Sequence, residues 1–391
     1  MVKNLGEKYT PLYFLAALGN GGMVVTFFIY LTFSIPHKHT PIVIFEQWTA
    51  LFAHAPIWKQ GLILFALAGI VYFFVNHIRL LLWNIREYRL FKQTEAYAQL
   101  KQSNAEVTLM AIPLTLAMTV NTLFILGAIF VPHLWSIVEY IFPLSLVAFL
   151  LTGYYSLKIF GDYYQRLMIH GGFDFHSNNS MAQMIAILSF AMSAVGLAAV
   201  GAMSHNEIVY GIAMFGTIFF IVTSMILAVL QGIQGFNAMM EYGISVEASP
   251  SLWIAIPILT LLGITTIRLY LGSSHHFLES GHPTAAPLFV VTSMVVAMQI
   301  MSGVMGYKVM KKLNYFKEYV YGEKKSPVSF SLICPGVSAF VFGMFFAFVG
   351  LTHNGIIQPF SIPFWIVVIP YIYIWIQTIL TLHRLTRKML Y

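Results

Sequence analysis

Residues 181–203 read MAQMIAILSFAMSAVGLAAVGAM and contain no charged side chain. A bilayer core ~30 Å thick is crossed by a helix of about 20 apolar residues, so this segment is long enough to span a membrane. Lipid offers the backbone no hydrogen-bond partner, and each such run must therefore be helical. The sequence contains ten runs of this kind, at 11–34, 60–85, 107–131, 135–158, 181–203, 206–231, 251–272, 285–308, 329–352 and 361–384. We therefore predict an all-α polytopic membrane protein with ten transmembrane helices in a single domain, residues 1–391.

The composition excludes a water-soluble protein. Of the 391 residues, 59% are hydrophobic and only 9% are charged, whereas roughly a quarter of the residues of a soluble domain are charged. The only cysteine, Cys334, excludes an intrachain disulfide and a multi-cysteine metal site. We expect no enzymatic activity and no cofactor.

The basic residues predict the orientation. All but three of the 21 Lys and Arg residues fall on alternate connections or at the two termini, and the exceptions are Lys38, Lys59 and Arg268. Because basic residues accumulate in cytoplasmic loops, both termini are expected in the cytoplasm, which requires an even number of spans. The net charge of +7 then reflects topology and some contact with anionic lipid, not nucleic acid. We expect a multi-pass protein of the cell membrane, the inner membrane in a bacterium.

The odd-numbered runs share a weak repeat. Runs 3, 7 and 9 contain Ala-Ile-Pro or Ile-Cys-Pro, run 5 has Ala-Ile-Leu in the same register, and Pro11 begins run 1. We expect these prolines to bend their helices; they are Pro11, Pro113, Pro257 and Pro335. Eight residues after each reference position stands a small or modestly polar residue, namely Gly19, Asn121, Gly196, Thr265 and Gly343.

Two interpretations of this repeat remain open. Small residues in membrane helices often only allow neighbouring helices to pack closely. Alternatively, five small residues at one depth leave room for a pore. In that case the chain forms five hairpins, with the odd helices in a central ring and the bulkier even helices around them. The small and polar residues that would line such a pore are Gly19, Thr115, Asn121, Ser193, Gly196, Thr260, Thr265, Ser338 and Gly343.

Charged groups are almost absent from the middle of the odd runs. A proton relay or coupling-ion site would require them, so their absence favours uncoupled conduction. Arg268, near the outer end of run 7, is a cation that could raise the anion concentration at a pore mouth. Its other interpretation is an arginine that extends to the membrane interface.

The stretch from Thr10 to Gly19, TPLYFLAALG, and Phe330-Ser331 at the entry to run 9 resemble the tellurite-resistance/dicarboxylate transporter family. That family includes the bacterial tellurite-resistance membrane protein and the plant slow-type anion channels. The resemblance implies a homotrimer in which each subunit has its own pore, plugged by a phenylalanine of the ninth helix. Phe340, near the middle of that run, is the first candidate for this gate and Phe342 the second.

These observations favour an anion channel or uncoupled permease for small inorganic or organic anions. A secondary transporter for dicarboxylate, sulfite or tellurite is an alternative. A further alternative is a membrane subunit of a redox or sensory complex that uses histidines predicted on the outer side, such as His37, His39, His275 and His276.

Overall fold

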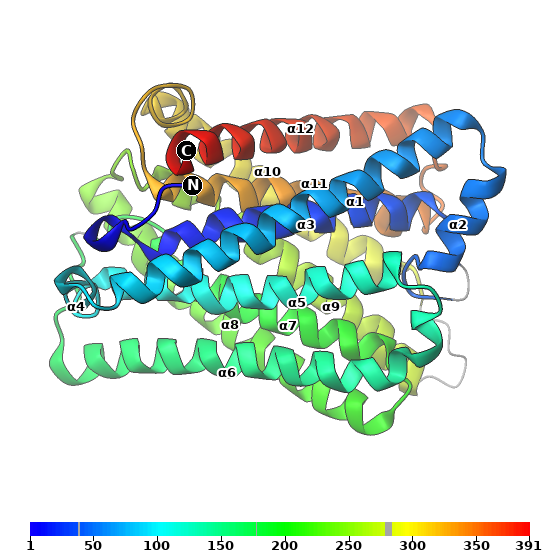
Figure 1. Ribbon diagram of the computed structural model, residues 1–391, viewed down its shortest axis with the longest axis horizontal. Helices are drawn as coiled ribbons and strands as arrows, with labels where there is room; N and C mark the ends of the chain where they lie inside the picture. Colours follow the sequence, from blue (N-terminus) through cyan, green and yellow to red (C-terminus); the bar gives the residue numbers. More distant parts are fainter. Residues whose placement is uncertain (38–39, 177, 278–283) are drawn as a thin grey trace.

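The computed structural model describes residues 1–37, 40–176, 178–277 and 284–391, and the described residues contain helices and no β-strand. Within these described ranges, ten helical spans are long and apolar enough to cross a membrane, which confirms the predicted number. Their main helices are α1 (Phe14–Ser34), α3 (Ile57–Phe91), α5 (Ala111–Phe130), α6 (Val138–His170), α7 (Ile185–Met203), α8 (Glu207–Tyr242), α9 (Ala255–Phe277), α10 (Ala286–Lys312), α11 (Ile333–Phe345) and α12 (Ile362–Leu390). Two short helices, α2 (Phe45–His54) and α4 (Glu95–Leu100), lie in connections at opposite ends of the bundle (Figure 1).

Several helices are longer than the sequence predicts, among them α3, α6 and α8. The apolar runs end near residues 85, 158 and 231, but α3, α6 and α8 continue to Phe91, His170 and Tyr242. The 36 residues of α8 correspond to roughly 54 Å of helix at 1.5 Å per residue, against a bilayer core of ~30 Å. The additional turns lie at the end of the bundle that also carries both chain termini, which we call the terminal end (Figure 1). Apolar content predicted only the part of each helix inside the bilayer.

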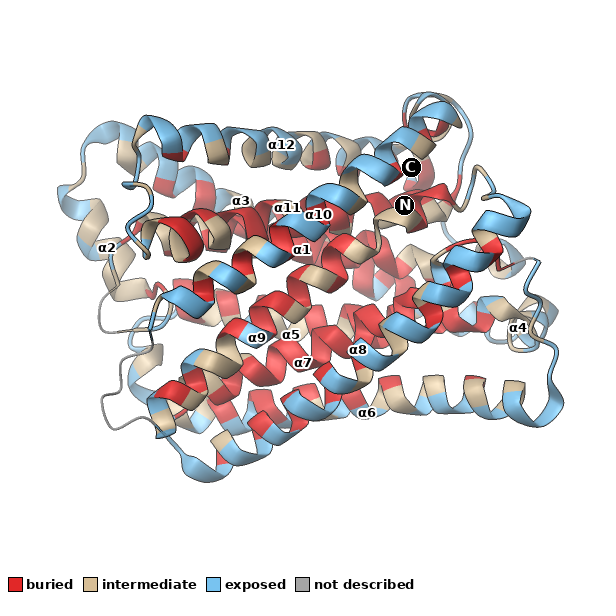
Figure 2. Ribbon diagram, turned by 180° about the vertical axis from the view of Figure 1, so that it is seen from behind, coloured by how far each residue is buried: buried red, intermediate tan, exposed pale blue. Residues whose placement is uncertain are grey.

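Burial separates the ten spans into two sets. In the most apolar stretch of each span, 89% of the residues are buried for α1 and 94% for α7. The corresponding share is only 17% for α12 and 28% for both α6 and α10. Figure 2 shows the same contrast, with buried residues concentrated on the central helices. Side chains such as Tyr140, Leu144 and Phe215 are largely exposed on the surface helices, as expected where lipid covers them.

The five most interior helices contact one another in sequence. Helix α1 contacts α5, α5 contacts α7, α7 contacts α9, α9 contacts α11, and α11 returns to α1. Each also contacts the surface helix that follows it in the chain: α3, α6, α8, α10 and α12 respectively. The ring of contacts therefore closes on itself around a central axis.

Each of these five helices begins in the same way. A short 3₁₀ segment precedes the α-helix at the terminal end; these segments are η2 (Pro11–Tyr13), η3 (Asn104–Met110), η5 (Ala182–Met184), η6 (Ser249–Trp253) and η8 (Pro327–Leu332). Helices α5, α9 and α11 begin at Ala111, Ala255 and Ile333, so the repeat seen in the sequence coincides with the change from 3₁₀ to α geometry.

The prolines of this repeat were expected to bend the helices; the structure gives their positions, and the bends themselves stay a prediction. Pro113, Pro257 and Pro335 are the third residues of α5, α9 and α11, and Pro11 begins η2. Proline is tolerated in the first turn, where its missing N–H costs the helix little. Pro113 and Pro335 thus lie just after the change from 3₁₀ to α geometry inside continuous helical spans. Pro143 of α6 and Pro370 of α12 lie in the interior of their α-helices.

Candidate functional site: the central cavity

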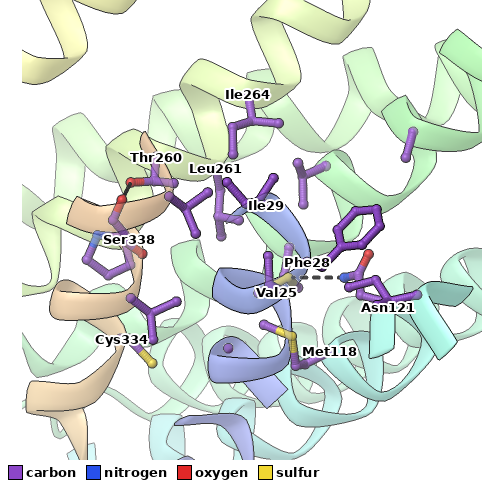
Figure 3. Close-up of a pocket in the computed structure, with 18 of the residues that line it drawn as sticks. Val25, Phe28, Ile29, Met118, Asn121, Thr260, Leu261, Ile264, Cys334 and Ser338 are labelled. Atoms are coloured by element: carbon purple, nitrogen blue, oxygen red, sulfur yellow. Dashed lines mark hydrogen bonds between the residues drawn. The ribbon is translucent and has the colours of Figure 1, made fainter. Parts of the chain in front are cut away.

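A cavity of about 150 Å³ lies along the axis of the five interior helices (Figure 3). All five helices contribute to its wall. The lining residues are mostly apolar and include Gly22, Val25, Phe28 and Ile29 of α1, Met118 and Phe124 of α5, Leu188, Met192, Val195 and Ala199 of α7, Leu261 and Ile264 of α9, and Val337, Val341 and Phe345 of α11. The cavity is therefore a property of the ring as a whole and not of one hairpin.

A few polar side chains face this apolar wall. Asn121 of α5 donates hydrogen bonds to the Ala117 carbonyl, at 3.3 Å, and to the Met192 sulfur, at 3.6 Å. The Thr260 hydroxyl of α9 lies 3.1 Å from the Ile256 carbonyl and 3.3 Å from the Ser338 carbonyl, while it accepts a 2.6 Å hydrogen bond from the Gln299 side chain of α10. The Thr260 contacts tie α9 to both α10 and α11 at the depth of the cavity.

Arg268 is the charged residue of the cavity wall. Its Nη1 donates a 2.8 Å hydrogen bond to the Val195 carbonyl, which lies across the α7–α9 contact. No carboxylate among the described residues forms an ion pair with it. A guanidinium carries five N–H donors, and one hydrogen bond to a described residue is present at Arg268.

A second cavity, of about 270 Å³, adjoins the first toward the terminal end. The second is bordered by the 3₁₀ segments that begin the interior helices, and it brings Ser251 and the exposed Glu247 to its wall. We call this space the vestibule; Leu188, Pro257 and Cys334 line both it and the central cavity.

The structure sorts the residues expected to line a pore. Gly19, Asn121, Thr260 and Ser338 do line the central cavity, and so do Arg268 and Pro257. Thr115, Ser193, Gly196, Thr265 and Gly343 do not, and neither do Pro11, Pro113 and Pro335.

The two glycines away from the cavity accommodate aromatic rings of surface helices. A Cβ atom added to Gly196 would lie 2.2 Å from the Phe149 ring of α6, and one added to Gly343 would lie 2.5 Å from the Tyr371 ring of α12. For these positions the packing interpretation of small residues is correct.

The three hydroxyl residues away from the cavity bond to backbone carbonyls. Thr265 bonds to Leu261 at 2.7 Å, and Ser193 to Ser189 at 3.4 Å. Thr115 bonds to Ala111 and, across the α1–α5 contact, to Phe14. These hydroxyl groups serve helix packing and are not available to a permeating ion.

Several residues expected to line a pore differ from the residues that line the cavity by a rotation about the helix axis. On α7 the cavity face runs through Leu188, Met192, Val195 and Ala199, at spacings of four, three and four residues. Val195 precedes Gly196 by one residue, and Ile264 likewise precedes Thr265. One residue corresponds to a rotation of about 100°, which is sufficient to turn a side chain from the axis to a neighbouring helix.

The phenylalanines expected to act as a gate also lie away from the cavity. The Phe340 ring stacks on Trp375 of α12, with centroids 5.0 Å apart and planes 21° apart. Phe342 packs against Gly263 of α9. The aromatic residues that line the cavity are Phe28, Phe124 and Phe345. Phe345 follows Cys334, Ser338 and Val341 at helical spacing, and this spacing was the available signal in the sequence.

His77 of α3 is fully buried and was not among the residues predicted from the sequence to form the site. Its Nδ1 lies 2.8 Å from the Ala17 carbonyl of α1, and its Nε2 lies 2.9 Å from the Thr119 hydroxyl of α5. Because a carbonyl can only accept, Nδ1 carries a proton. The imidazole thus connects one surface helix to two helices of the ring.

Two of the histidines expected on the outer side, His39 and His282, lie outside the described residues, as does Lys38. His205 Nδ1 lies 2.9 Å from a Glu139 carboxylate oxygen, and its ring is 5.6 Å from that of His275. Within the described ranges, no group of three or more His, Cys, Asp or Glu side chains is arranged to hold a metal ion.

Comparisons with models of protein families, with curated proteins and with solved structures found no match to this chain. The resemblance to the tellurite-resistance/dicarboxylate transporter family therefore remains a prediction from the sequence, as does the homotrimer that it implies.

Proposed function

We propose that the protein is a membrane channel or uncoupled permease that conducts small anions through the central cavity, with the five interior helices as the pore and the surface helices as its shield from lipid. The observation that carries this proposal is Arg268: a guanidinium on the wall of a cavity whose other described lining residues are uncharged, bonded to one carbonyl and to no described carboxylate. In such surroundings a fixed cation attracts anions and repels cations.

The volume of the cavity limits the size of the substrate. A water molecule occupies about 30 Å³ in the liquid, so 150 Å³ corresponds to roughly five water molecules. A halide, an oxyanion or a short carboxylate fits with part of its hydration shell.

Uncoupled conduction is favoured because a coupled carrier normally uses ionisable groups within the membrane. The described lining of the central cavity contains no Asp, Glu, Lys or His. Glu247 borders the vestibule, but it is exposed and accepts a 2.6 Å hydrogen bond from Ser326. Solvent and salt screen a carboxylate in that position, so we expect it to reduce anion entry only slightly.

The test is ion-replacement electrophysiology on the purified protein in planar bilayers. In a KCl gradient the reversal potential should approach that of chloride, and it should shift when chloride is replaced by a large anion such as gluconate. Arg268→Gln should reduce the anion-to-cation permeability ratio at least tenfold, whereas Arg268→Lys should retain most of it. Lys59→Gln is the matched control because it removes one positive charge from the start of α3, outside the cavity wall.

Two results would contradict the proposal. One is a reversal potential near that of potassium in the unmodified protein. The other is flux in liposomes that occurs only when a proton gradient is imposed, which would indicate a secondary transporter instead.

A further inference from the structure

A groove separate from the central cavity lies between the surface helices α10 and α12. It has a volume of about 740 Å³, larger than that of the central cavity. Helix α11, which contacts both α10 and α12, forms its floor at Pro335, Gly336 and Ala339. The groove therefore opens on the lipid-facing side of the bundle.

The walls of this groove are mostly apolar along the membrane-spanning part, with the polar side chains Gln299, Gln377, Thr378 and Thr381 among them. Ile300 and Val304 of α10 face Ile374 of α12, and all three side chains are substantially exposed. Ile300 precedes Lys311 by 11 residues, or about 16 Å along the helix. That distance is about half the thickness of a bilayer core, so the apolar part of the groove extends through one leaflet.

The mouth of the groove, at the terminal end, is basic. Lys311, in the last turn of α10, and Lys317, in the segment η7 (Phe316–Tyr321), both line it and are exposed. The Lys311 ammonium lies 5.7 Å from the centre of the Tyr307 ring, and the Arg384 guanidinium lies 4.4 Å from that of Tyr321. The described lining residues of the groove include no carboxylate.

This combination matches an anionic phospholipid. Tyrosine and lysine at the end of a membrane span lie at the depth of lipid headgroups, and basic pockets between membrane helices bind anionic headgroups. We propose that the groove holds one anionic phospholipid, with its phosphate between Lys311 and Lys317 and an acyl chain against Ile300, Val304 and Ile374. A second copy of the chain is disfavoured, because a symmetric contact through this groove would bring two basic mouths together.

Native mass spectrometry of the purified full-length protein tests this proposal. The protein is mixed with equal amounts of phosphatidylglycerol and phosphatidylcholine of the same acyl chains. We expect preferential retention of phosphatidylglycerol. Each basic residue near a membrane surface contributes about a fivefold effect on binding of anionic lipid, so Lys311→Gln with Lys317→Gln should weaken the preference by about 25-fold. The double variant Lys308→Gln with Lys312→Gln removes the same charge from exposed positions that do not line the groove, and it should retain the preference.

A second variant tests the apolar part of the site. A Cβ atom added to Gly303 would have only one neighbour within 4 Å, the Ile256 Cδ1 at 3.9 Å, so a leucine at this position fits and fills the groove. Gly303→Leu should reduce retention of both lipids several-fold. Gly211→Leu is the control, because that glycine lies on exposed α8 and has nothing within 4 Å of its added Cβ.

Three outcomes would overturn the proposal. They are equal retention of the two lipids by the unmodified protein, retention by Gly303→Leu equal to that of the unmodified protein, and a dimer that is lost only in Gly303→Leu. The last would assign the groove to a second copy of the chain. None of these measurements depends on ion conduction.

Discussion

At the residue scale, close helix contacts depend on positions where no side chain fits. Gly336 of α11 is the tightest of these, since a Cβ atom there would lie 1.9 Å from the Thr378 hydroxyl oxygen of α12. That hydroxyl is held by a 2.7 Å hydrogen bond to the Ile374 carbonyl, so it cannot move away without losing a bond.

We therefore expect Gly336→Ala to destabilise the protein by about 1–3 kcal/mol, the usual cost of overpacking. The measurement is the apparent melting temperature in detergent. Gly303→Ala is the control, since its added Cβ meets nothing closer than 3.9 Å. Replacing Thr378 by alanine in the Gly336→Ala background should restore part of the loss; no restoration would contradict the steric explanation.

The buried imidazole of His77 gives a second expectation at this scale. His77→Leu removes the hydrogen bonds to Ala17 and Thr119 and leaves polar groups on two other helices without this partner, so we expect a loss of about 1–3 kcal/mol. His383 also has two described partners, the Tyr72 hydroxyl and the Ile379 carbonyl, but it is exposed. His383→Leu should therefore change the melting temperature much less, and equal effects of the two substitutions would contradict this assignment.

At the element scale, the two faces of α11 differ in what they contact. Cys334, Ser338, Val341 and Phe345 face the cavity, while Phe340 faces α12. After Phe345 the helix continues as the π-helical segment η9 (Phe346–Thr352), and such irregular turns are frequent at functional sites. The ring at Phe345 therefore lies where the helix changes geometry.

We expect Phe345→Ala to increase single-channel conductance at least twofold, because it removes a ring from the cavity wall. Phe340→Ala should leave conductance unchanged and instead lower the melting temperature, because it removes the ring stacked on Trp375. Single-channel recording of both variants at matched expression checks this. The opposite result, in which only Phe340→Ala changes the conductance, would contradict this prediction and favour Phe340 as the gate, as the family resemblance implies.

The sequence predicted helix number and the start of the repeat better than it predicted which side chains face the axis. Runs of apolar residues set the number, and the Ala-Ile-Pro motifs coincide with the first turns of α5 and α9. To predict which side chains of a helix face the axis, the rotation of the helix must be known to better than about 100°, the angle between consecutive residues. A helix as apolar as α7 has similar residues on every side, so its sequence does not indicate that rotation. Gly196 and Thr265 lie away from the central cavity, whereas Asn121 and Thr260 line it.

At the scale of the whole molecule, the central cavity and the vestibule lie in sequence along the bundle and meet at Leu188, Pro257 and Cys334. Cys334 is the only cysteine in the chain. It thus provides a natural probe at the boundary between the two spaces.

If anions pass this boundary, a small charged methanethiosulfonate reagent applied from the terminal end should react with Cys334 and block more than half of the current. Thiol reagents need a water-exposed sulfur to react at a useful rate, so the reaction itself reports access. Cys334→Ser should conduct and resist the block. The contradicting result is a current that the reagent leaves unchanged in the protein with Cys334 intact, although mass spectrometry shows that Cys334 has reacted. That result would place the conduction path away from this position.

The vestibule has an electrical consequence. It lies at the terminal end of the bundle among the 3₁₀ segments of the interior helices, and water admitted to it conducts far better than the apolar wall of the central cavity. If the central cavity conducts as proposed, most of the voltage across the membrane falls over the short stretch between Cys334 and Arg268. A monovalent ion that crosses this stretch gains or loses about 2.3 kcal/mol for each 100 mV, so the fold confines electrical work to a few turns of helix.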